Sequence, residues 1–160
     1  MFIYLKRKIN TYILKTKYNL ARKIAATIID YTLIFAFYIW YIFEFGLPNE
    51  EGSYTISGLG ALLPILVWVL YFVIAEKYCA ATLGHEIVKL KVVSVDGAEL
   101  SFGQVFKRRI CDALEISWCF GIIAFFIAEN NDKHQRLGDI LAKTLVIGKN
   151  DVYEPVRNRF

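Results

Sequence analysis

The sequence has few of the residues that build metal centres, disulfide frameworks or redox sites. It has only three cysteines, Cys79, Cys111 and Cys119, and two histidines, His85 and His134. The cysteines form no Cys-X-X-Cys pair, and no histidine lies at metal-ligand spacing from them. We therefore expect small buried hydrophobic cysteines, histidines in loops, and no metal or cofactor.

Catalytic motifs are also missing. Serine, histidine and aspartate residues do not assemble into a nucleophilic motif, and no glycine-rich phosphate-binding loop is present. No nucleic-acid-binding fold signature accompanies the basic residues. The sequence predicts a protein that is not an enzyme and does not bind nucleic acid; an enzyme acting on lipid is the least favoured alternative.

Acidic residues are absent from the first 24 positions. Seven basic residues lie there: Lys6, Arg7, Lys8, Lys15, Lys17, Arg22 and Lys23. A basic leader before an apolar block is typical of a cytoplasmic surface that faces anionic lipid headgroups. The spacing of Phe2, Leu5 and Ile9 favours an interfacial helix over residues 1–17, with a disordered basic tail as the alternative. A signal peptide is not expected, because the charged leader is too long and no small-residue cleavage site follows.

Apolar residues are in excess, and they are gathered into long blocks. They make up 56% of the chain, and the mean hydropathy is +0.41. Residues 25–45 and 59–75 are each long enough to cross a bilayer. The loop between them, 46–58, contains Glu50 and Glu51 and no basic residue. The sequence predicts a multi-pass protein of the cell membrane with a cytoplasmic N-terminus.

The next segment, residues 76–109, holds six basic residues and is expected to be a cytoplasmic loop. Its stretch 87–95 (IVKLKVVSV) alternates in part with period two, and Asp96-Gly97 follows as a turn signal. Ser101 and Gln104 then have the spacing of a capping box that begins a helix.

A third apolar block, residues 110–128, predicts either another crossing or a re-entrant or broken hairpin. Asp132 and Gln135 suggest a second capping box, which would open a helix over about 133–142. The β-branched stretch 144–147 predicts a strand. If this strand pairs with the one near 92–95, the third block must enter and return. Six further basic residues in 133–159 favour a cytoplasmic C-terminus, which three full crossings would place outside.

The predicted fold is therefore an all-α membrane protein. It is a small helical bundle with two full transmembrane helices, a third apolar segment and a short cytoplasmic strand–turn element. One membrane domain spans residues 18–148, and 149–160 form a polar tail.

Asp30 is the first candidate functional residue, because it lies five residues into the first apolar block. A carboxylate at membrane depth costs roughly 2.5–3.5 kcal/mol on insertion scales. It is therefore neutral, paired or hydrated, either as a proton- or cation-binding site or as a structural partner that locks helices together. Arg22 lies roughly 12 Å earlier along an ideal helix. It anchors at lipid phosphates or reaches a carboxylate from another segment.

Three charged residues of the C-terminal half are further candidates. Arg136 and Asp139 are three residues apart on the predicted helix, which is typical of a solvated salt bridge. Asp112 lies four residues after Arg108, so local pairing is favoured over a role as a second site.

The order of these motifs resembles the RDD family of membrane proteins. The residues are Arg22 and Asp30, Thr82-Leu83-Gly84 with the strand-like stretch and turn, the basic SFGQVFKRR, Gln135-Arg136-Leu137-Gly138-Asp139, and Thr144-Leu145-Val146-Ile147. Gly138 departs from the pattern, because a histidine is common at that position. The resemblance implies that Asp139 and Arg22 are functional residues that pair at the cytoplasmic interface.

Two functions are expected from this pattern. The resemblance implies a small transporter of cations and protons, or of an unknown ligand. Asp30 would be its ion-binding residue because of its membrane depth. We expect a homo-oligomer, because three short membrane segments offer little internal volume. The alternative is a non-enzymatic membrane adaptor or assembly factor whose basic strand–turn element recruits a partner protein.

Overall fold

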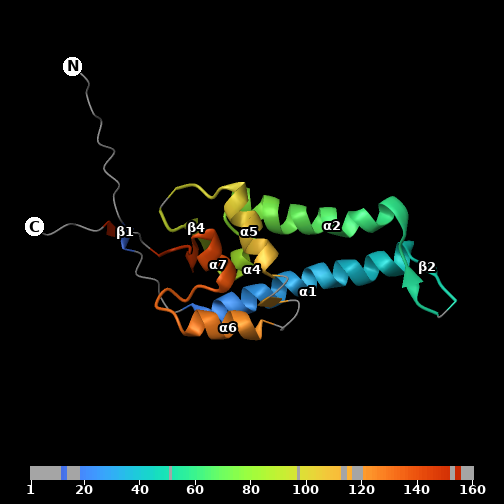
Figure 1. Ribbon diagram of the computed structural model, residues 1–160, viewed down its shortest axis with the longest axis horizontal. Helices are drawn as coiled ribbons and strands as arrows, with labels where there is room; N and C mark the ends of the chain where they lie inside the picture. Colours follow the sequence, from blue (N-terminus) through green and yellow to red (C-terminus); the bar gives the residue numbers. More distant parts are fainter. Residues whose placement is uncertain are drawn as a thin grey trace, which may run out of the picture.

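Two long apolar helices lie side by side and make up one half of the molecule (Figure 1). The computed structural model describes residues 12–13, 19–50, 52–96, 98–112, 115–116, 121–151 and 154–155. Helix α1 is Leu20–Phe45, and a second continuous helix is Gly58–Cys79. The second helix begins as the 3₁₀ turn η1 (Gly58–Leu62) and continues as α2 (Leu63–Trp68), the π-helical stretch η2 (Val69–Ile74) and α3 (Ala75–Cys79).

Both helices are long and apolar enough to cross a membrane. Their most apolar windows have mean hydropathies of 1.6 and 2.4, yet only 22% and 11% of the residues in those windows are buried. A core helix of a soluble protein would be mostly buried, so these apolar surfaces need another cover, and a bilayer provides it. The far ends of the helices are joined by the hairpin of β2 (Leu47–Pro48) and β3 (Tyr54–Thr55).

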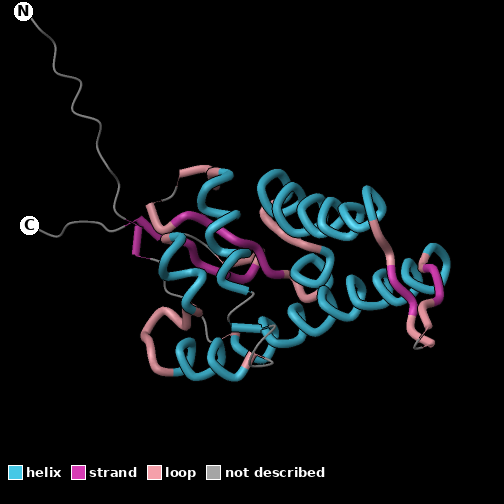
Figure 2. Tube along the Cα trace, turned by 45° about the vertical axis from the view of Figure 1, so that its right-hand side comes forward, coloured by secondary structure: helices cyan, strands magenta, loops and turns pink. Residues whose placement is uncertain are grey.

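The other half contains shorter helices around a two-stranded ribbon (Figure 2). Strand β4 (Leu90–Ser94) pairs antiparallel with β5 (Thr144–Gly148), so both predicted strands form, and they pair as the sequence left open. Around the ribbon lie α4 (Leu83–Ile87), α5 (Phe102–Asp112), α6 (Ile122–Glu129) and α7 (Leu137–Ala142). The core of this half consists of Leu90, Val92, Leu100, Val105 and Val146, together with Val73 from the second long helix.

The third apolar block is divided in the part of the chain that the structure describes. Helix α5 ends at Asp112, and α6 begins only at Ile122, after Gly121 has donated its N–H to the Glu115 carbonyl at 3.0 Å. Two separate helices, α5 and α6, therefore cover described residues of 110–128, as the broken-hairpin alternative expects, and the number of crossings stays a prediction.

One of the two predicted capping boxes forms. The Ser101 N–H donates to Gln104 Oε1 at 3.0 Å, and the Gln104 N–H donates to Ser101 Oγ at 3.2 Å. The second prediction is wrong: Asn131 Oδ1 accepts from the Gln135 N–H, which makes a turn, and α7 begins only at Leu137.

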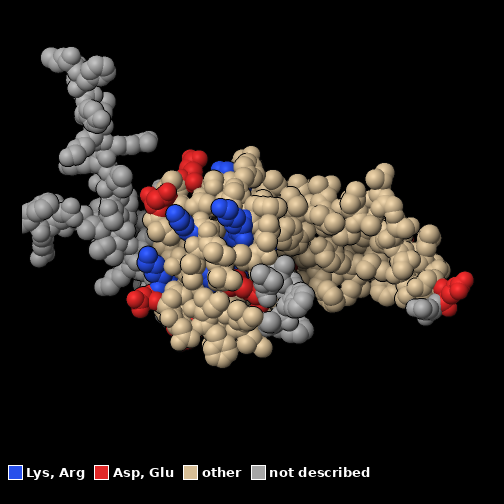
Figure 3. Space-filling model, viewed as in Figure 1, with Lys and Arg blue, Asp and Glu red and all other residues tan. Residues whose placement is uncertain are grey.

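The mainly helical class is confirmed, but strands add more to the fold than predicted. Besides the ribbon and the hairpin, β1 (Tyr12–Ile13) pairs antiparallel with β6 (Glu154–Pro155). Apart from these two strands, the predicted interfacial segment 1–17 and most of the polar tail lie outside the described residues. On the face seen in Figure 3, charged side chains gather over the half with the short helices and at the hairpin tip, and none is visible over the long helices between them.

The pairing of β1 with β6 predicts the sidedness of the chain ends, because it holds both at the same end of the molecule. We expect a fluorescent reporter and a phosphatase reporter, each fused in turn to either terminus, to report one and the same side of the membrane. Opposite sides for the two termini would contradict the pairing.

Candidate functional site

Six buried charged side chains form a closed ring in the half with the short helices. Its cations are Arg108, Arg109 and Arg136, and its anions are Glu76, Asp112 and Asp139. Each of the six contacts two ring members of opposite charge, so the ring carries no net charge. All are at most 2% exposed except Arg136, whose side chain is 13% exposed.

The ring joins three separate parts of the chain. Glu76, on α3, lies between the two arginines of α5: Oε1 is 3.3 Å from Arg108 Nε, and Oε2 is in contact with Arg109 Nη2. The α5 residue Asp112 then binds Arg109 Nη1 through Oδ2, at 2.9 Å.

Asp112 also contacts Arg136, which directly precedes α7. Its Oδ1 binds Arg136 Nη1 at 2.9 Å. Asp139 closes the ring, since its Oδ1 is 3.0 Å from Arg108 Nη1 and its Oδ2 is 4.0 Å from Arg136 Nε. Burial by itself would raise the pKa of Asp139, but Arg108 and Arg136 outweigh burial and hold that pKa below its ordinary value.

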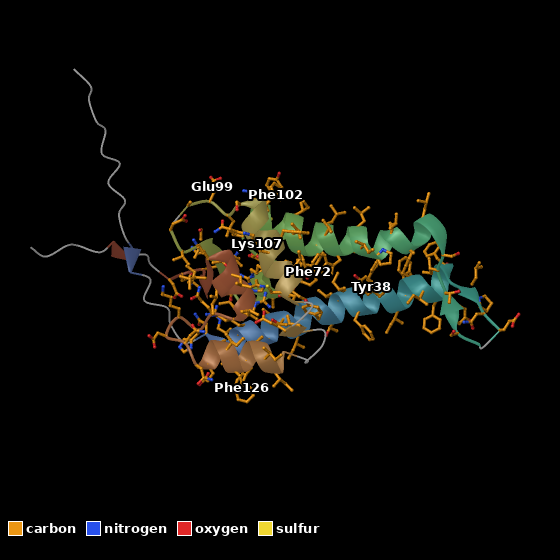
Figure 4. The ribbon with its side chains drawn as sticks, in the orientation of Figure 1. Tyr38, Phe72, Glu99, Phe102, Lys107 and Phe126 are labelled. Carbon is orange, nitrogen blue, oxygen red and sulfur yellow. The ribbon has the colours of Figure 1, made fainter. Side chains whose placement is uncertain are left out.

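An aromatic side chain packs against the ring, and helices α5 and α7 approach each other closely beside it. The Arg109 guanidinium lies over the ring of Phe72, 4.6 Å from its centroid, and Phe72 is fully buried where the second long helix meets α5 (Figure 4). At Gly138 a side chain would bring its Cβ to 2.8 Å from the Arg108 carbonyl oxygen. Glycine at this position therefore lets α7 approach α5 closely enough to close the ring.

Asp30 lies outside the ring, in a cage of hydrogen-bond donors. The Tyr71 hydroxyl donates to Oδ1 at 2.6 Å, the Gly84 N–H to Oδ1 at 2.7 Å, and the Thr82 hydroxyl to Oδ2 at 2.5 Å. The carboxylate is 1% exposed. Three donors stabilise its ionised form at a depth where an unpaired charge would be costly, and they tie α1 to η2 and α4.

Gly84 determines how closely α4 can approach α1. A Cβ at this position would clash with the Ala26 carbonyl oxygen and lie 2.8 Å from the Asp30 carboxyl carbon. Only a residue without a side chain brings its backbone N–H within bonding distance of Asp30.

His85 connects the cage to an open cavity. Its Nδ1 is 2.7 Å from Thr82 Oγ1 and 3.4 Å from Asp30 Oδ2. Because the Thr82 hydroxyl donates to Asp30, Nδ1 is the donor in its contact with Thr82. The predicted loop position of His85 is wrong: the residue lies in α4 and is 4% exposed.

The cavity has a volume of about 330 Å³ and lies between α1 and α6. Its walls are mainly apolar and include Ile24, Ile28, Ile122 and Phe125. The polar part of its lining comprises Lys23, Thr27, His85, Arg108, His134, Arg136 and Asp139. The cavity thus reaches both His85 and one edge of the ion ring.

The structure brings some predicted residues together and separates others. Arg136, Asp139 and the secondary candidate Asp112 meet in the ring, but Arg22 does not pair with Asp139. Its guanidinium donates to the carbonyl oxygens of Val88 and Lys89, at the C-terminal end of α4. The predicted pair fails because buried Arg108 binds Asp139 from α5. The local partner of Asp112 is Arg109 rather than Arg108.

Sequence reasoning missed Glu76, Tyr71, Thr82 and His85 as site residues. Glu76 directly follows the second apolar block, at the start of the segment predicted to be a cytoplasmic loop. Its signal was its position four residues beyond Phe72 on an apolar helix, where a carboxylate needs a buried partner.

Removing one carboxylate from the ring is expected to be far more costly than removing a surface carboxylate. Glu76→Gln removes one of the anions that Arg108 and Arg109 contact in a buried site. We expect the free energy of unfolding to fall by about 3–5 kcal/mol. The matched control is Glu86→Gln, which breaks the exposed pair of Glu86 with Lys149 and should cost under about 1 kcal/mol. Denaturation of both purified variants in detergent measures the difference; equal losses would show that the ring does not stabilise the fold.

His85 predicts a pH dependence of stability. Burial, together with Arg108 and Arg109, lowers the pKa of His85 below its ordinary 6.5 despite the raising effect of Asp30 and Glu76. The unfolded chain therefore takes up this proton at a higher pH than the folded chain, and stability falls as pH drops below about 6.5. We expect His85→Gln to flatten the fall in unfolding midpoint between pH 7 and pH 5. An unchanged slope would contradict the prediction.

The chain has relatives among membrane proteins. The model of the RDD family matches residues 19–143, which include every residue of the ring and of the Asp30 cage. The uncharacterized membrane protein YteJ of Bacillus subtilis (strain 168) is 29% identical over 103 residues, 63% of this chain and 60% of that protein. The chain thus matches about three fifths of that relative's length. No solved structure matches the chain.

Proposed function

The chain belongs to the RDD family of membrane proteins, and we propose that it is a small multi-pass transporter of the cell membrane, with its N-terminus in the cytoplasm, that exchanges a cation for protons as a homo-oligomer. The contact between Asp30 and His85 is the observation that carries this proposal. It joins a carboxylate inside an apolar helix to a side chain in the wall of a cavity.

The proposed proton path begins at the cavity. His85 exchanges a proton there and passes it through the Thr82 hydroxyl, or directly, to Asp30. Protonation would remove the charge that the donors of the cage stabilise. The hydrogen bonds from Tyr71 and Gly84 would weaken, and α1 would be less firmly held to α4. Proton binding at Asp30 would then shift the chain between two arrangements, which transport requires.

The homo-oligomer follows from the small number of spanning helices. Two apolar helices lying side by side enclose no path through a bilayer, and their outward faces are apolar. A cation path would therefore lie between copies of the chain, next to the Asp30 cage of each.

Flux in proteoliposomes tests the proposal. Purified protein is reconstituted with an internal pH dye, and Na⁺ or K⁺ is added across a pH gradient. We expect Asp30→Asn to abolish cation-dependent proton movement and His85→Gln to shift its pH dependence. Glu44→Gln is the matched control, because Glu44 is an exposed acid near the far end of α1.

Two outcomes would contradict the proposal. One is normal flux from Asp30→Asn. The other is an absence of flux from a wild-type protein that elutes as a single folded species. Size-exclusion elution and unfolding midpoint of each variant separate a lost transport step from a lost fold.

A non-enzymatic adaptor is the second candidate, and one feature of α5 favours it. Phe102, Phe106 and Ile110 recur every four residues along this helix and are 46%, 48% and 51% exposed. This apolar stripe lies on the charged half of the molecule, where a partner protein would dock. A stoichiometric partner in cross-linked membranes, together with no flux from purified protein, would support this role. Neither candidate involves catalysis.

A further inference from the structure

The cavity between α1 and α6 has the chemistry of a site for an anionic amphiphile. Three basic side chains line it, Lys23, Arg108 and Arg136, against one carboxylate, Asp139. That carboxylate is already in contact with both arginines. The groups facing the cavity are therefore positive in sum, and the remaining anions of the ring, Glu76 and Asp112, are not among its lining residues.

One of these cations, Arg136, has a donor nitrogen that no described residue accepts from. Arg136 Nη2 is buried and has no hydrogen-bond partner among the described residues, whereas Nη1 of the same group binds Asp112 at 2.9 Å. A buried guanidinium nitrogen without an acceptor is costly, and an anionic oxygen in the cavity would satisfy it. Lys23 Nζ donates to the His134 carbonyl oxygen at 2.7 Å and keeps two further N–H donors.

The walls of the cavity indicate where the occupant comes from. Ile28 on α1 is 60% exposed and Ile122 on α6 is 58% exposed, so the cavity is continuous with apolar outer surface. Phe126 points outward from α6, away from the body of the molecule (Figure 4). On the α1 side, this surface belongs to a helix that needs lipid cover. An occupant that enters beside α1 and α6 thus has an apolar chain as well as an anionic group.

We propose that this cavity binds the phosphate headgroup of an anionic phospholipid, with Lys23 and Arg136 as its ligands and an acyl chain between α1 and α6. A volume of about 330 Å³ holds a headgroup and the start of one chain, and the rest of the lipid stays in the bilayer. The site shares the cavity at which the proposed proton path begins. Lipid binding is measured apart from that path, because it needs neither Asp30 nor a gradient.

Native mass spectrometry of the full chain from detergent tests the site. The protein is mixed with equal amounts of dioleoylphosphatidylglycerol and dioleoylphosphatidylcholine. We expect it to retain the anionic lipid preferentially. Lys23→Gln should weaken that binding about ten-fold, as expected for the loss of one charge-assisted hydrogen bond. Lys23→Arg should restore it. The control is Lys107→Gln, which removes the same charge from an exposed position on α5.

A second pair of variants tests the apolar part without changing any charge. Ala124 lines the cavity, whereas its neighbour Ile123 does not and is 41% exposed. We expect Ala124→Phe to fill the space and reduce lipid retention, and Ile123→Phe to leave it unchanged.

Three results would overturn the proposal. Equal retention of the two lipids would show no anionic preference. Equal losses in Lys23→Gln and Lys107→Gln would show general surface attraction. Displacement of the lipid by inorganic phosphate at equal concentration would show a site for a free anion instead. Because binding is measured without flux, failure here leaves the transport proposal standing, and failure of transport leaves this one standing.

Discussion

The closed ring of Glu76, Arg108, Arg109, Asp112, Arg136 and Asp139 is the constraint on which the polar half of the molecule depends. Each of these charges has left water, and removing one partner would leave another charge uncompensated in a site of low dielectric. The ring therefore tolerates only the arrangement in which α3, α5 and the start of α7 meet. The β4–β5 ribbon and the close contact at Gly138 bring α7 to that position.

The Asp30 cage applies the same principle with neutral donors. A carboxylate in an apolar helix is satisfied by two hydroxyls and a backbone N–H, so it locks α1 to its neighbours without a cation. Tyr71 comes from the π-helical stretch η2, and Glu76 follows a few residues later on α3. The irregular segment thus contributes Tyr71 to the cage, and the regular turn that follows it contributes Glu76 to the ring. Such departures from regular helix geometry are frequent at functional sites.

The features that could be predicted from the sequence are those determined by residues close together in the chain. The two apolar blocks, the Ser101 capping box and the strands near 92–95 and 144–147 all have short-range signals. The partners of the charges do not. Asp139 binds Arg108 of another helix rather than Arg22, and His85 is buried against a residue more than fifty positions earlier in the chain. Hydropathy shows that a charge needs a partner, but only the tertiary fold selects it from several of the right sign.

The composition of the ring also fits the order in which a ribosome makes it. Glu76, Arg108, Arg109 and Asp112 are synthesised first, and these two cations and two anions sum to zero charge. Arg136 and Asp139 then arrive within a few residues of each other as one further cation and one further anion. The nascent chain therefore adds charge to this site in balanced pairs. At neither stage does assembly require an unmatched charge to wait in the interior for a partner still inside the ribosome.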